Sequence, residues 1–276
     1  MKQQPSLKDK VAVVTGGGRG IGRAAALMLA RAGASVVVTA RSRDEIEVVA
    51  GEIKALGARA VAIPADISTW KAAERLCQET ERAFGRADVV VANAGILHPV
   101  GFAWENDADA WTSNIQINLL GVFYTLRAFL PEMVRENSGK FIAVSSGAAS
   151  HVIPSWSAYA AAKAGVEHLV RHTGAELAHR NSAVRVHALR PGIVATRMQG
   201  EVRAVPESVF PGVGRFKEFH EKGMLRSPDE SASLILWLAT PAADDLNGGT
   251  ADIDDPEIRR RMTADLGIPM LKGRGE

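Results

Sequence analysis

The chain has 276 residues, of which 46% are hydrophobic and 23% charged, proportions that are ordinary for a globular protein. Its 33 lysines and arginines nearly balance 31 acidic residues, which argues against a nucleic-acid-binding protein. The single cysteine, Cys77, excludes an internal disulfide, and no uncharged apolar run approaches the ~20 residues that span a bilayer. With a polar first stretch as well, we expect a cytoplasmic protein without a membrane partner.

The first elements follow the pattern of a nucleotide-binding unit. Val11 to Thr15 is an apolar, β-branched run that predicts a buried parallel strand, and a glycine-rich loop follows it directly. An Ala/Leu-rich helix is then expected from Ile21 to Ala32, and a second strand from Ser35 to Thr39. A glycine loop in this strand–loop–helix–strand context predicts a dinucleotide phosphate site, although glycines also make purely structural turns.

The glycines of the loop have separate tasks in such a site. Gly16 allows the tight turn, Gly20 lets the backbone approach a pyrophosphate, and Gly22 lets the helix pack on the strand. The start of the helix adds free N–H groups and a partial positive charge.

The end of the second strand indicates which dinucleotide binds. An acidic residue there is typical of NAD, whose ribose carries a 2′-hydroxyl, and arginine is typical of the 2′-phosphate of NADP. The strand runs into Arg41 with no carboxylate before Asp44, and Arg19 in the glycine loop adds a second positive charge. We therefore favour NADP(H), the alternative being that Arg41 and Arg43 merely begin an exposed helix.

The alternation of strands and helices continues with strands at 60–63 and 88–92 and a helix at 69–84. Asp66 follows a strand end, where it can accept a hydrogen bond from an adenine amino group or simply hold a turn. Asn93-Ala94-Gly95 ends the fourth strand, and its glycine permits close approach of the backbone.

One long helix is expected from Asp107 to Val134. Its middle is apolar around most of its circumference, which predicts one face on the sheet and another on a partner subunit. Asn118 is the exception within this apolar run. A buried amide must be hydrogen-bonded, so Asn118 is either a satisfied structural residue or a residue that holds water.

A candidate acid/base pair follows the fifth strand, which is expected at 140–145. Tyr159 and Lys163 are four residues apart in an Ala-rich helix, so they lie on the same helix face. A neighbouring ammonium favours the phenolate, so we expect the pKa of Tyr159 to fall from about 10. The alternative is an exposed tyrosine and lysine without a role.

Other catalytic patterns are missing from the sequence. It contains no G-x-S-x-G motif, which argues against a nucleophilic serine hydrolase. His168 and His172 share a helix face without a clear third ligand, so a solvated face is expected there rather than a metal site.

The last third of the chain has fewer signals. A sixth strand at 184–189 leads to Pro191-Gly192, whose turn can lie along a nicotinamide ring, and to Thr196. Residues 197–225 show little periodicity and are expected to form a mobile lid over the substrate. A final helix is expected at 231–240 and an unusually acidic strand at 250–254, and 256–276 is a charged tail that either packs across a subunit boundary or is disordered.

Together these residues resemble the short-chain dehydrogenase/reductase family, over roughly residues 8 to 240. The motifs that carry the resemblance occur in the family's order and spacing: Thr15-Gly-Gly-Gly-Arg-Gly-Ile-Gly22, Asp66, Asn93-Ala-Gly95, Asn118, Ser146, Tyr159-x-x-x-Lys163, Pro191-Gly192 and Thr196. The resemblance and the element pattern predict an α/β fold: a single Rossmann-type domain over 1–276 with a doubly wound parallel sheet of about seven strands and helices on both faces. Dimers or tetramers built through the long helix and the next one are implied as well.

The resemblance also implies roles for the site residues. Tyr159 is the general acid/base, Lys163 lowers its pKa and binds the nicotinamide ribose, Ser146 binds the carbonyl, and Asn118 serves a proton relay. Ser146 is preferred over Ser145 by the family's spacing. The expected cofactor-binding residues are Gly16, Gly18, Arg19, Gly20, Ile21, Gly22, Arg41, Asp66, Ile67, Asn93, Ala94, Gly95, Tyr159, Lys163, Pro191, Gly192, Val194 and Thr196.

The expected function is NADP(H)-dependent interconversion of a small-molecule carbonyl and its alcohol, with no metal. Ser146, His151, Trp156 and Tyr159 are expected to bind the substrate, within walls that also include His98, Val100, Val152, Ile193 and Met198. These walls suit a moderately hydrophobic ketone, while Arg197 and Arg203 meet either an anion or solvent. The alternatives are an epimerase- or dehydratase-type reaction on the same scaffold, or a non-enzymatic NADP-binding redox sensor.

Overall fold

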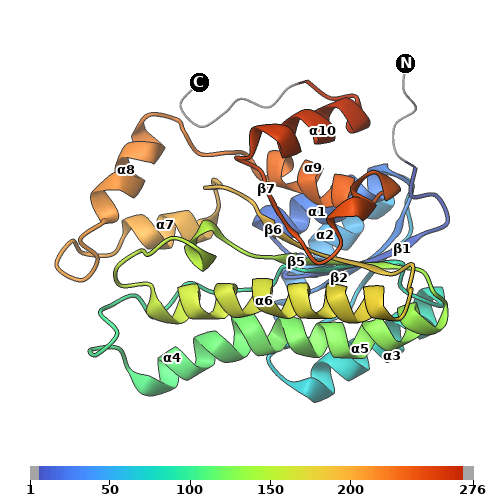
Figure 1. The fold of residues 1–276 in the computed structure, drawn as a ribbon, viewed down its shortest axis with the longest axis horizontal. Coiled ribbons are helices and arrows are strands. Elements are labelled where there is room, and N and C mark those ends of the chain that lie inside the picture. The colour runs from blue at the N-terminus through green and yellow to red at the C-terminus, as the bar shows by residue number, and fades with distance from the viewer. Residues whose placement is uncertain (1–5, 270–276) are drawn as a thin grey trace.

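Seven parallel strands form one sheet at the centre of the computed structural model, which describes residues 6–269 (Figure 1). The strands are β1 Val11–Thr15, β2 Ser35–Thr39, β3 Ala60–Ala62, β4 Val89–Ala92, β5 Lys140–Val144, β6 Arg185–Arg190 and β7 Thr250–Asp252. Their spatial order is β3-β2-β1-β4-β5-β6-β7, with every neighbouring pair parallel. The order reverses between β1 and β4, and in such sheets ligands bind beyond the carboxyl ends of the strands at this point.

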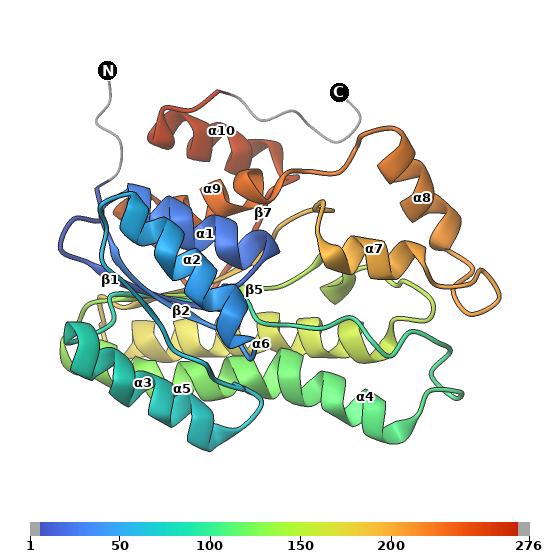
Figure 2. The same ribbon diagram turned by 180° about the vertical axis from the view of Figure 1, so that it is seen from behind.

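Helices cover both faces of the sheet (Figures 1 and 2). They are α1 Gly20–Arg31, α2 Arg43–Ala55, α3 Trp70–Phe84, α4 Ala108–Ile115, α5 Gly121–Arg135, α6 Ser157–His179, α7 Arg197–Arg203, α8 Val213–Glu221, α9 Pro228–Leu238 and α10 Pro256–Leu266. Helices α1, α2, α9 and α10 lie on one face, and α3, α5 and α6 on the other. The predicted doubly wound parallel sheet is confirmed.

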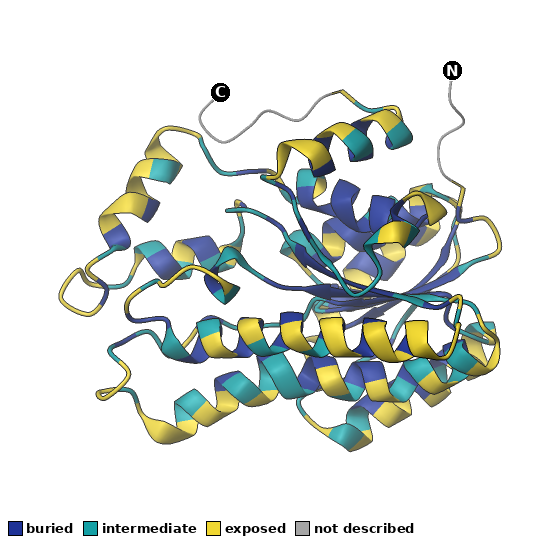
Figure 3. Cartoon of the chain, viewed as in Figure 1, coloured by how far each residue is buried: buried dark blue, intermediate teal, exposed yellow. Residues whose placement is uncertain are grey.

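The burial of the strands explains why they read as continuous apolar runs. Successive side chains point to opposite faces, so Val13 packs under α3, α5 and α6 while Val14 packs under α1 and α9. Both faces are covered, and Figure 3 shows the strands as the most continuously buried part of the chain. A sheet buried on both faces requires apolar residues at consecutive positions rather than at alternate ones.

The long helix expected at 107–134 is present but not regular. It consists of α4, a π-helical turn over Gln116–Leu120, and α5. The combined stretch 108–135 is long and apolar enough to cross a membrane by length and composition alone. Phe129 and Met133 in it are buried against the sheet, as in the core helix of a water-soluble protein. The π turn contains Asn118, and such turns are frequent at functional sites.

The last third of the chain contains more helix than its weak periodicity predicts. Residues 197–225, expected to form a lid, contain two helices, α7 and α8, and the helix at 228–238 is followed by a further helix, α10, within the expected tail. Asp255 caps α10 by accepting from the backbone N–H groups of Glu257 and Ile258, and Gly267 ends the helix in the left-handed conformation. The apolar face of α10, which includes Met262, joins the core beside α9. Residues 270–276 of the expected tail lie outside the described residues.

Candidate active site

A cavity of about 1580 Å³ lies at the carboxyl ends of the strands. The segments that follow β1, β2, β4, β5 and β6 line it, and α7 and α8 form the remaining wall beyond the strand ends. Every site residue predicted from the sequence lines this cavity, except Gly22 and Asn118. Residues that are far apart in the chain therefore meet in one space.

The glycine loop after β1 is shaped for a close approach of its backbone. Gly16 and Gly20 have φ values of 62° and 53°, in the left-handed region that favours glycine. Asn93 holds the loop from β4, because its Nδ2 donates to the carbonyl oxygens of Thr15 at 2.9 Å and Gly16 at 3.2 Å. The loop leads directly into the N-terminus of α1, where unpaired N–H groups suit a pyrophosphate.

Gly22 has the packing role that the sequence predicts for it. A Cβ added there would lie 2.2 Å from the carbonyl oxygen of Gly16, so only glycine lets α1 start against the loop. This explains why Gly22 shapes the site without lining the cavity.

One end of the cavity is lined by charged residues from the glycine loop and from the segment that follows β2. Arg41 lines it directly after β2 and forms no ion pair among residues 6–269. Arg19 also lines it, but its Nη1 lies 3.4 Å from Glu45 Oε1. Glu45 was not predicted as a site residue; it lies six residues after Thr39, the last residue of β2, in the first turn of α2. The only hint in the sequence was that Glu45 is an acidic residue at the start of a helix that begins beside the glycine loop.

Asp66 holds a turn, as one of its two alternatives predicts, and also lines the cavity. Its Oδ1 accepts from the backbone N–H of Ser68 at 3.1 Å, so it holds the turn after β3. The residue also lines the cavity, beside Ile67. The two alternatives therefore do not exclude each other.

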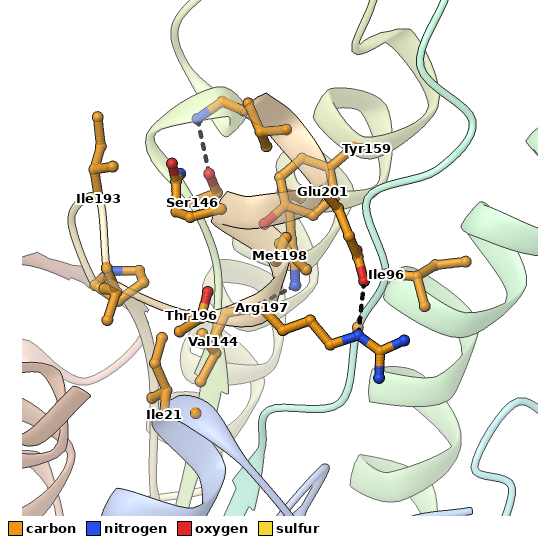
Figure 4. Close-up of a pocket in the computed structure, with 18 of the residues that line it drawn as sticks. Ile21, Ile96, Val144, Ser146, Tyr159, Ile193, Thr196, Arg197, Met198 and Glu201 are labelled. Carbon is orange, nitrogen blue, oxygen red and sulfur yellow. Dashed lines mark hydrogen bonds and ion pairs between the residues drawn. The ribbon is translucent and has the colours of Figure 1, made fainter. Parts of the chain in front are cut away.

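Ser146, Tyr159 and Lys163 all line the cavity. Figure 4 shows Ser146 and Tyr159 there. Tyr159 and Lys163 come from the first turns of α6, and Ser146 follows the end of β5. The Lys163 ammonium lies 5.6 Å from the centre of the Tyr159 ring. Its Nζ donates to the backbone carbonyl of Val144 at 2.8 Å.

The expected fall in the pKa of Tyr159 is wrong for this structure. Burial raises the pKa of the phenol above its ordinary value, and hydrogen bonding to Ser146 only partly offsets that. Burial also lowers the pKa of Lys163 to about 8. The phenol therefore stays protonated at neutral pH, which is the form that donates a proton.

The two consecutive serines have different surroundings. Ser145 is buried, and its hydroxyl donates to Glu167 Oε1 at 2.8 Å. The same carboxylate accepts from Arg190, with Nε donating to Oε1 and Nη2 to Oε2. Ser146 lies beside Tyr159, and its oxygen accepts from the backbone N–H of Ala148 at 3.2 Å. The Ser146 hydroxyl therefore lies at the cavity beside the Tyr159 phenol, to which it is hydrogen-bonded, and this position supports the choice of Ser146.

Asn118 is fully buried and hydrogen-bonded, as one of its two alternatives requires. Its Nδ2 donates to the carbonyl oxygen of Ile96 and to Asn114 Oδ1, both at 2.8 Å, and its Oδ1 accepts from the N–H of Ile96 at 3.1 Å. A Cβ on Gly95 would lie 2.6 Å from Oδ1 and 3.6 Å from Lys163 Nζ. Asn118 therefore fixes the loop after β4 close to the lysine.

Aromatic side chains form the wall beyond Tyr159. The indole of Trp156 lies edge-on to Tyr159 at 5.8 Å and packs on Phe210 and Phe216 at 5.6 and 5.3 Å, all as ring-centre distances. Phe210 and Phe216 were not predicted as site residues. The hint in the sequence was that these two large apolar residues stand within an otherwise polar stretch around α8.

Most of the predicted substrate walls line the cavity. His98, His151, Val152, Trp156, Ile193 and Met198 do so. Val100 does not, because it packs behind the aromatic cluster of Trp156 and Phe210.

Comparison with known proteins agrees with this geometry. The family model for short chain dehydrogenase matches residues 10–207. A 3-oxoacyl-[acyl-carrier-protein] reductase of Synechocystis sp. is 36% identical over 251 residues, covering 90% of this chain and 97% of its own. A cis-4-hydroxycyclohexanecarboxylate dehydrogenase of Sinomonas cyclohexanicum is 35% identical, with coverage of 89% and 95%.

Solved structures give the same result. A levodione reductase superposes with a TM-score of 0.82 at 28% identity, covering 91% of this chain and 98% of its own. A 7α-hydroxysteroid dehydrogenase complexed with NADH and 7-oxo glycochenodeoxycholic acid gives 0.80 at 28% identity, with coverage of 90% and 94%. This chain, with its glycine loop and its Ser–Tyr–Lys cluster in one cavity, belongs to the short-chain dehydrogenase family and is an NAD(P)-dependent oxidoreductase.

Proposed function

We propose that the protein interconverts a ketone or aldehyde and its alcohol with NADP(H), using Tyr159 as general acid/base. The observation that carries this proposal is the continuity of the cavity from the glycine loop at Gly16 and Gly20 to Ser146, Tyr159 and Lys163. A dinucleotide extended along it from the loop would end beside the phenol. The positive φ of both glycines and the close approach of the loop backbone fit such a group.

A nicotinamide held between the glycine loop and Lys163 would supply the hydride chemistry of the reaction. In the direction of reduction, the Tyr159 hydroxyl gives its proton to the carbonyl oxygen as negative charge develops there. Ser146 donates a hydrogen bond to the same oxygen and polarises the carbonyl. The buried ammonium of Lys163 then offsets the charge left on the phenolate, and the family resemblance also assigns it to the nicotinamide ribose.

The preference for NADP(H) over NAD(H) rests on Arg41. Its guanidinium lines the cavity after β2, and no carboxylate stands at this strand end. A planar guanidinium matches the geometry of a phosphate better than that of a hydroxyl. Arg19 adds positive charge, which its ion pair with Glu45 partly offsets.

The role of Asn118 in a proton relay is part of the same proposal. Its amide is held by Ile96 and Asn114, so only the second lone pair of Oδ1 is left for a water molecule. That oxygen lies on the side of Lys163, as the contacts of Gly95 with both residues indicate.

The substrate that we propose is a moderately hydrophobic ketone or secondary alcohol. The aromatic cluster of Trp156, Phe210 and Phe216 beside Tyr159 supports this class. The names of two similar proteins, a hydroxycyclohexanecarboxylate dehydrogenase and a levodione reductase, are compatible with it.

We further propose that the enzyme is a cytoplasmic homo-oligomer, a dimer or a tetramer, that assembles through α5 and α6. Phe123 on α5 is 40% exposed although it belongs to an apolar helix, which favours a partner on this face. The single cysteine, Cys77, is buried and free, as is usual in the reducing cytoplasm.

The test is a fluorescence titration with NADPH and with NADH, followed by an NADPH-consumption assay with a panel of cyclic and aryl ketones. We expect NADPH to bind at least about tenfold more tightly, and one NADPH to be oxidised for each alcohol formed. Tighter NADH binding would reverse the cofactor preference. Product formation without net NADPH oxidation would favour an epimerase- or dehydratase-type reaction instead.

A further inference from the structure

The half of the cavity between Tyr159 and the helices α7 and α8 is called the substrate half. Arg203 places in it a cation that forms no ion pair among the described residues. It lies in α7, the helix that borders the cavity beyond the strand ends, and its side chain lines the cavity. Its Nη1 atom is buried, and no residue in the described part of the chain accepts a hydrogen bond from it. No carboxylate among the described residues pairs with the Arg203 guanidinium, so this residue brings to the cavity wall a positive charge that the fold does not itself neutralise.

The other charges in the cavity do not neutralise Arg203. Four of the five carboxylates that line the cavity face another arginine: Glu45 with Arg19, Glu201 with Arg197, Asp252 with Arg190, and Asp254 with Arg226. The fifth, Asp66, lies in the other half of the cavity, directly after β3, and holds the turn there. The four paired carboxylates are therefore engaged by arginines other than Arg203, and the Arg203 charge is left for an anionic ligand to balance.

Arg197 provides an internal comparison in the same helix. Its Nε lies 3.3 Å from Glu201 Oε1, one helical turn further along, and Figure 4 shows this pair at the cavity. Arg215 on α8 lies over the ring of Phe219 at 5.2 Å. Of these arginines, Arg203 is the one whose buried nitrogen is without an acceptor among the described residues.

The wall between the reacting group and α8 determines the shape of the ligand. Tyr159 contacts Trp156, which in turn packs on Phe216, so an apolar surface extends from the phenol towards α8. The buried Nε1 of Trp156 also lacks an acceptor in the described residues. This half of the cavity thus has an aromatic wall, and two buried donors within that wall, Arg203 Nη1 and Trp156 Nε1, have no acceptor among the described residues.

From these contacts we infer that the substrates are oxo acids and hydroxy acids whose carboxylate is bound by Arg203. The reacting carbonyl lies at Ser146 and Tyr159, an apolar ring or chain covers Trp156 and Phe216, and the carboxylate pairs with the guanidinium. The two oxygens of a carboxylate can accept from two parallel N–H groups on one edge of a guanidinium. The inference rests on the proposed function for the reaction, and adds the charge and anchor of the substrate.

The direct test is a binding measurement that requires no turnover. Cyclohexanecarboxylate and cyclohexanecarboxamide have the same ring and nearly the same size, and differ in charge. Calorimetric titration of the full-length protein with each, with and without NADPH, compares their affinities. We expect the carboxylate to bind at least about tenfold more tightly, which is the scale of one charge-assisted hydrogen bond.

Three variants assign that preference to one residue. In Arg203→Met we expect the preference to fall to within about threefold, because the apolar stem is kept and the charge is removed. Arg203→Lys should retain part of it, since an ammonium keeps the charge but not the planar pair of donors. Arg197→Met is the matched control, and the preference should persist in it because Arg197 is already paired with Glu201.

The outcomes separate this inference from the proposed function. Equal affinity for the acid and the amide, or a preference that persists in Arg203→Met, would overturn the anchor while leaving ketone reduction untouched. Steady-state kinetics with 4-oxocyclohexanecarboxylate and its methyl ester provide a second test. In Arg203→Met, the KM should rise for the acid and stay unchanged for the ester. If neither ketone is reduced although the carboxylate preference holds, the reaction fails and the anion site stands.

Discussion

Lys163 donates its Nζ hydrogen bond to the backbone carbonyl of Val144, the last residue of β5, at 2.8 Å. This bond joins the first turns of α6 to the strand end that carries Ser146, and so helps to set the position of Ser146 relative to Tyr159. The lysine is buried, and burial lowers its pKa to about 8. A group of the proposed acid/base machinery therefore titrates just above neutral pH, without a carboxylate partner at its ammonium among the described residues.

This titration predicts the pH dependence of ketone reduction. The ammonium form of Lys163 stabilises the phenolate that Tyr159 becomes, and it is lost as the pH rises through about 8. We expect kcat/KM for reduction to be level below that pH and to fall about tenfold per pH unit above it. The measurement is a pH–rate profile at constant ionic strength. A profile that stays level to pH 10 would contradict the prediction.

Lys163 also links stability to pH. Its pKa is lowered in the folded protein from 10.5 to about 8, so between these values the unfolded chain binds more protons, and stability rises with pH. We expect the free energy of unfolding to gain about 2 kcal/mol from this residue between pH 7 and pH 9.5. Lys163→Met should lack this gain, be more stable than the natural protein at pH 7, and be inactive. Urea unfolding of both proteins at the two pH values measures it, and parallel changes in the two would refute it.

Removal of the phenol hydroxyl tests the acid/base assignment. Tyr159→Phe keeps the ring that packs against Trp156 at 5.8 Å, so the fold and cofactor binding should be retained. We expect kcat to fall at least ~100-fold, the usual contribution of general acid/base catalysis. Single-turnover kinetics with pre-bound NADPH report this step directly. Near-normal turnover would exclude Tyr159 as the proton donor.

The two serines after β5 provide a matched pair of variants. Ser146→Ala should lower kcat for reduction by 10- to 1000-fold, on the order of the loss of one oxyanion hydrogen bond, with little effect on stability. Ser145→Ala removes the donor to Glu167 and should cost about 1 kcal/mol of stability with nearly normal kcat. Thermal unfolding and steady-state assays of both variants decide between the serines, and the reverse result would assign the carbonyl to Ser145.

The positions of Arg41 and Glu45 lead to a prediction about the preference for NADPH over NADH. Arg41→Ala should weaken NADPH binding about tenfold or more and leave NADH binding nearly unchanged, since only NADPH has the 2′-phosphate. Glu45→Gln frees Arg19 from its ion pair at 3.4 Å and should shift the preference further towards NADPH. Fluorescence titrations with both dinucleotides measure the ratio of affinities. An unchanged ratio in Arg41→Ala would show that the 2′-phosphate is bound elsewhere.

The sequence by itself determined those parts of the protein that depend on local pattern. The β-branched runs at Val11 and Ser35, the glycine loop between them and the Tyr159–Lys163 spacing were enough to predict the parallel sheet and the residues at its carboxyl edge. These signals are readable because a strand buried on both faces must be continuously apolar, and because an i, i+4 pair on a helix shares a face.

Only the tertiary structure determined the pKa values of the site residues and the walls of the substrate half of the cavity. The pKa of Tyr159 depends on how much chain covers the ring, which the residues around it in sequence do not report, so its direction was predicted wrongly. The helices α7 and α8 have weak periodicity and owe their position to packing on Trp156, and α10 was hidden in an acidic, arginine-rich stretch. Whether an arginine is paired depends on a three-dimensional neighbour: Arg197 meets Glu201, whereas Arg203 on the same helix is left without an acceptor in the described chain.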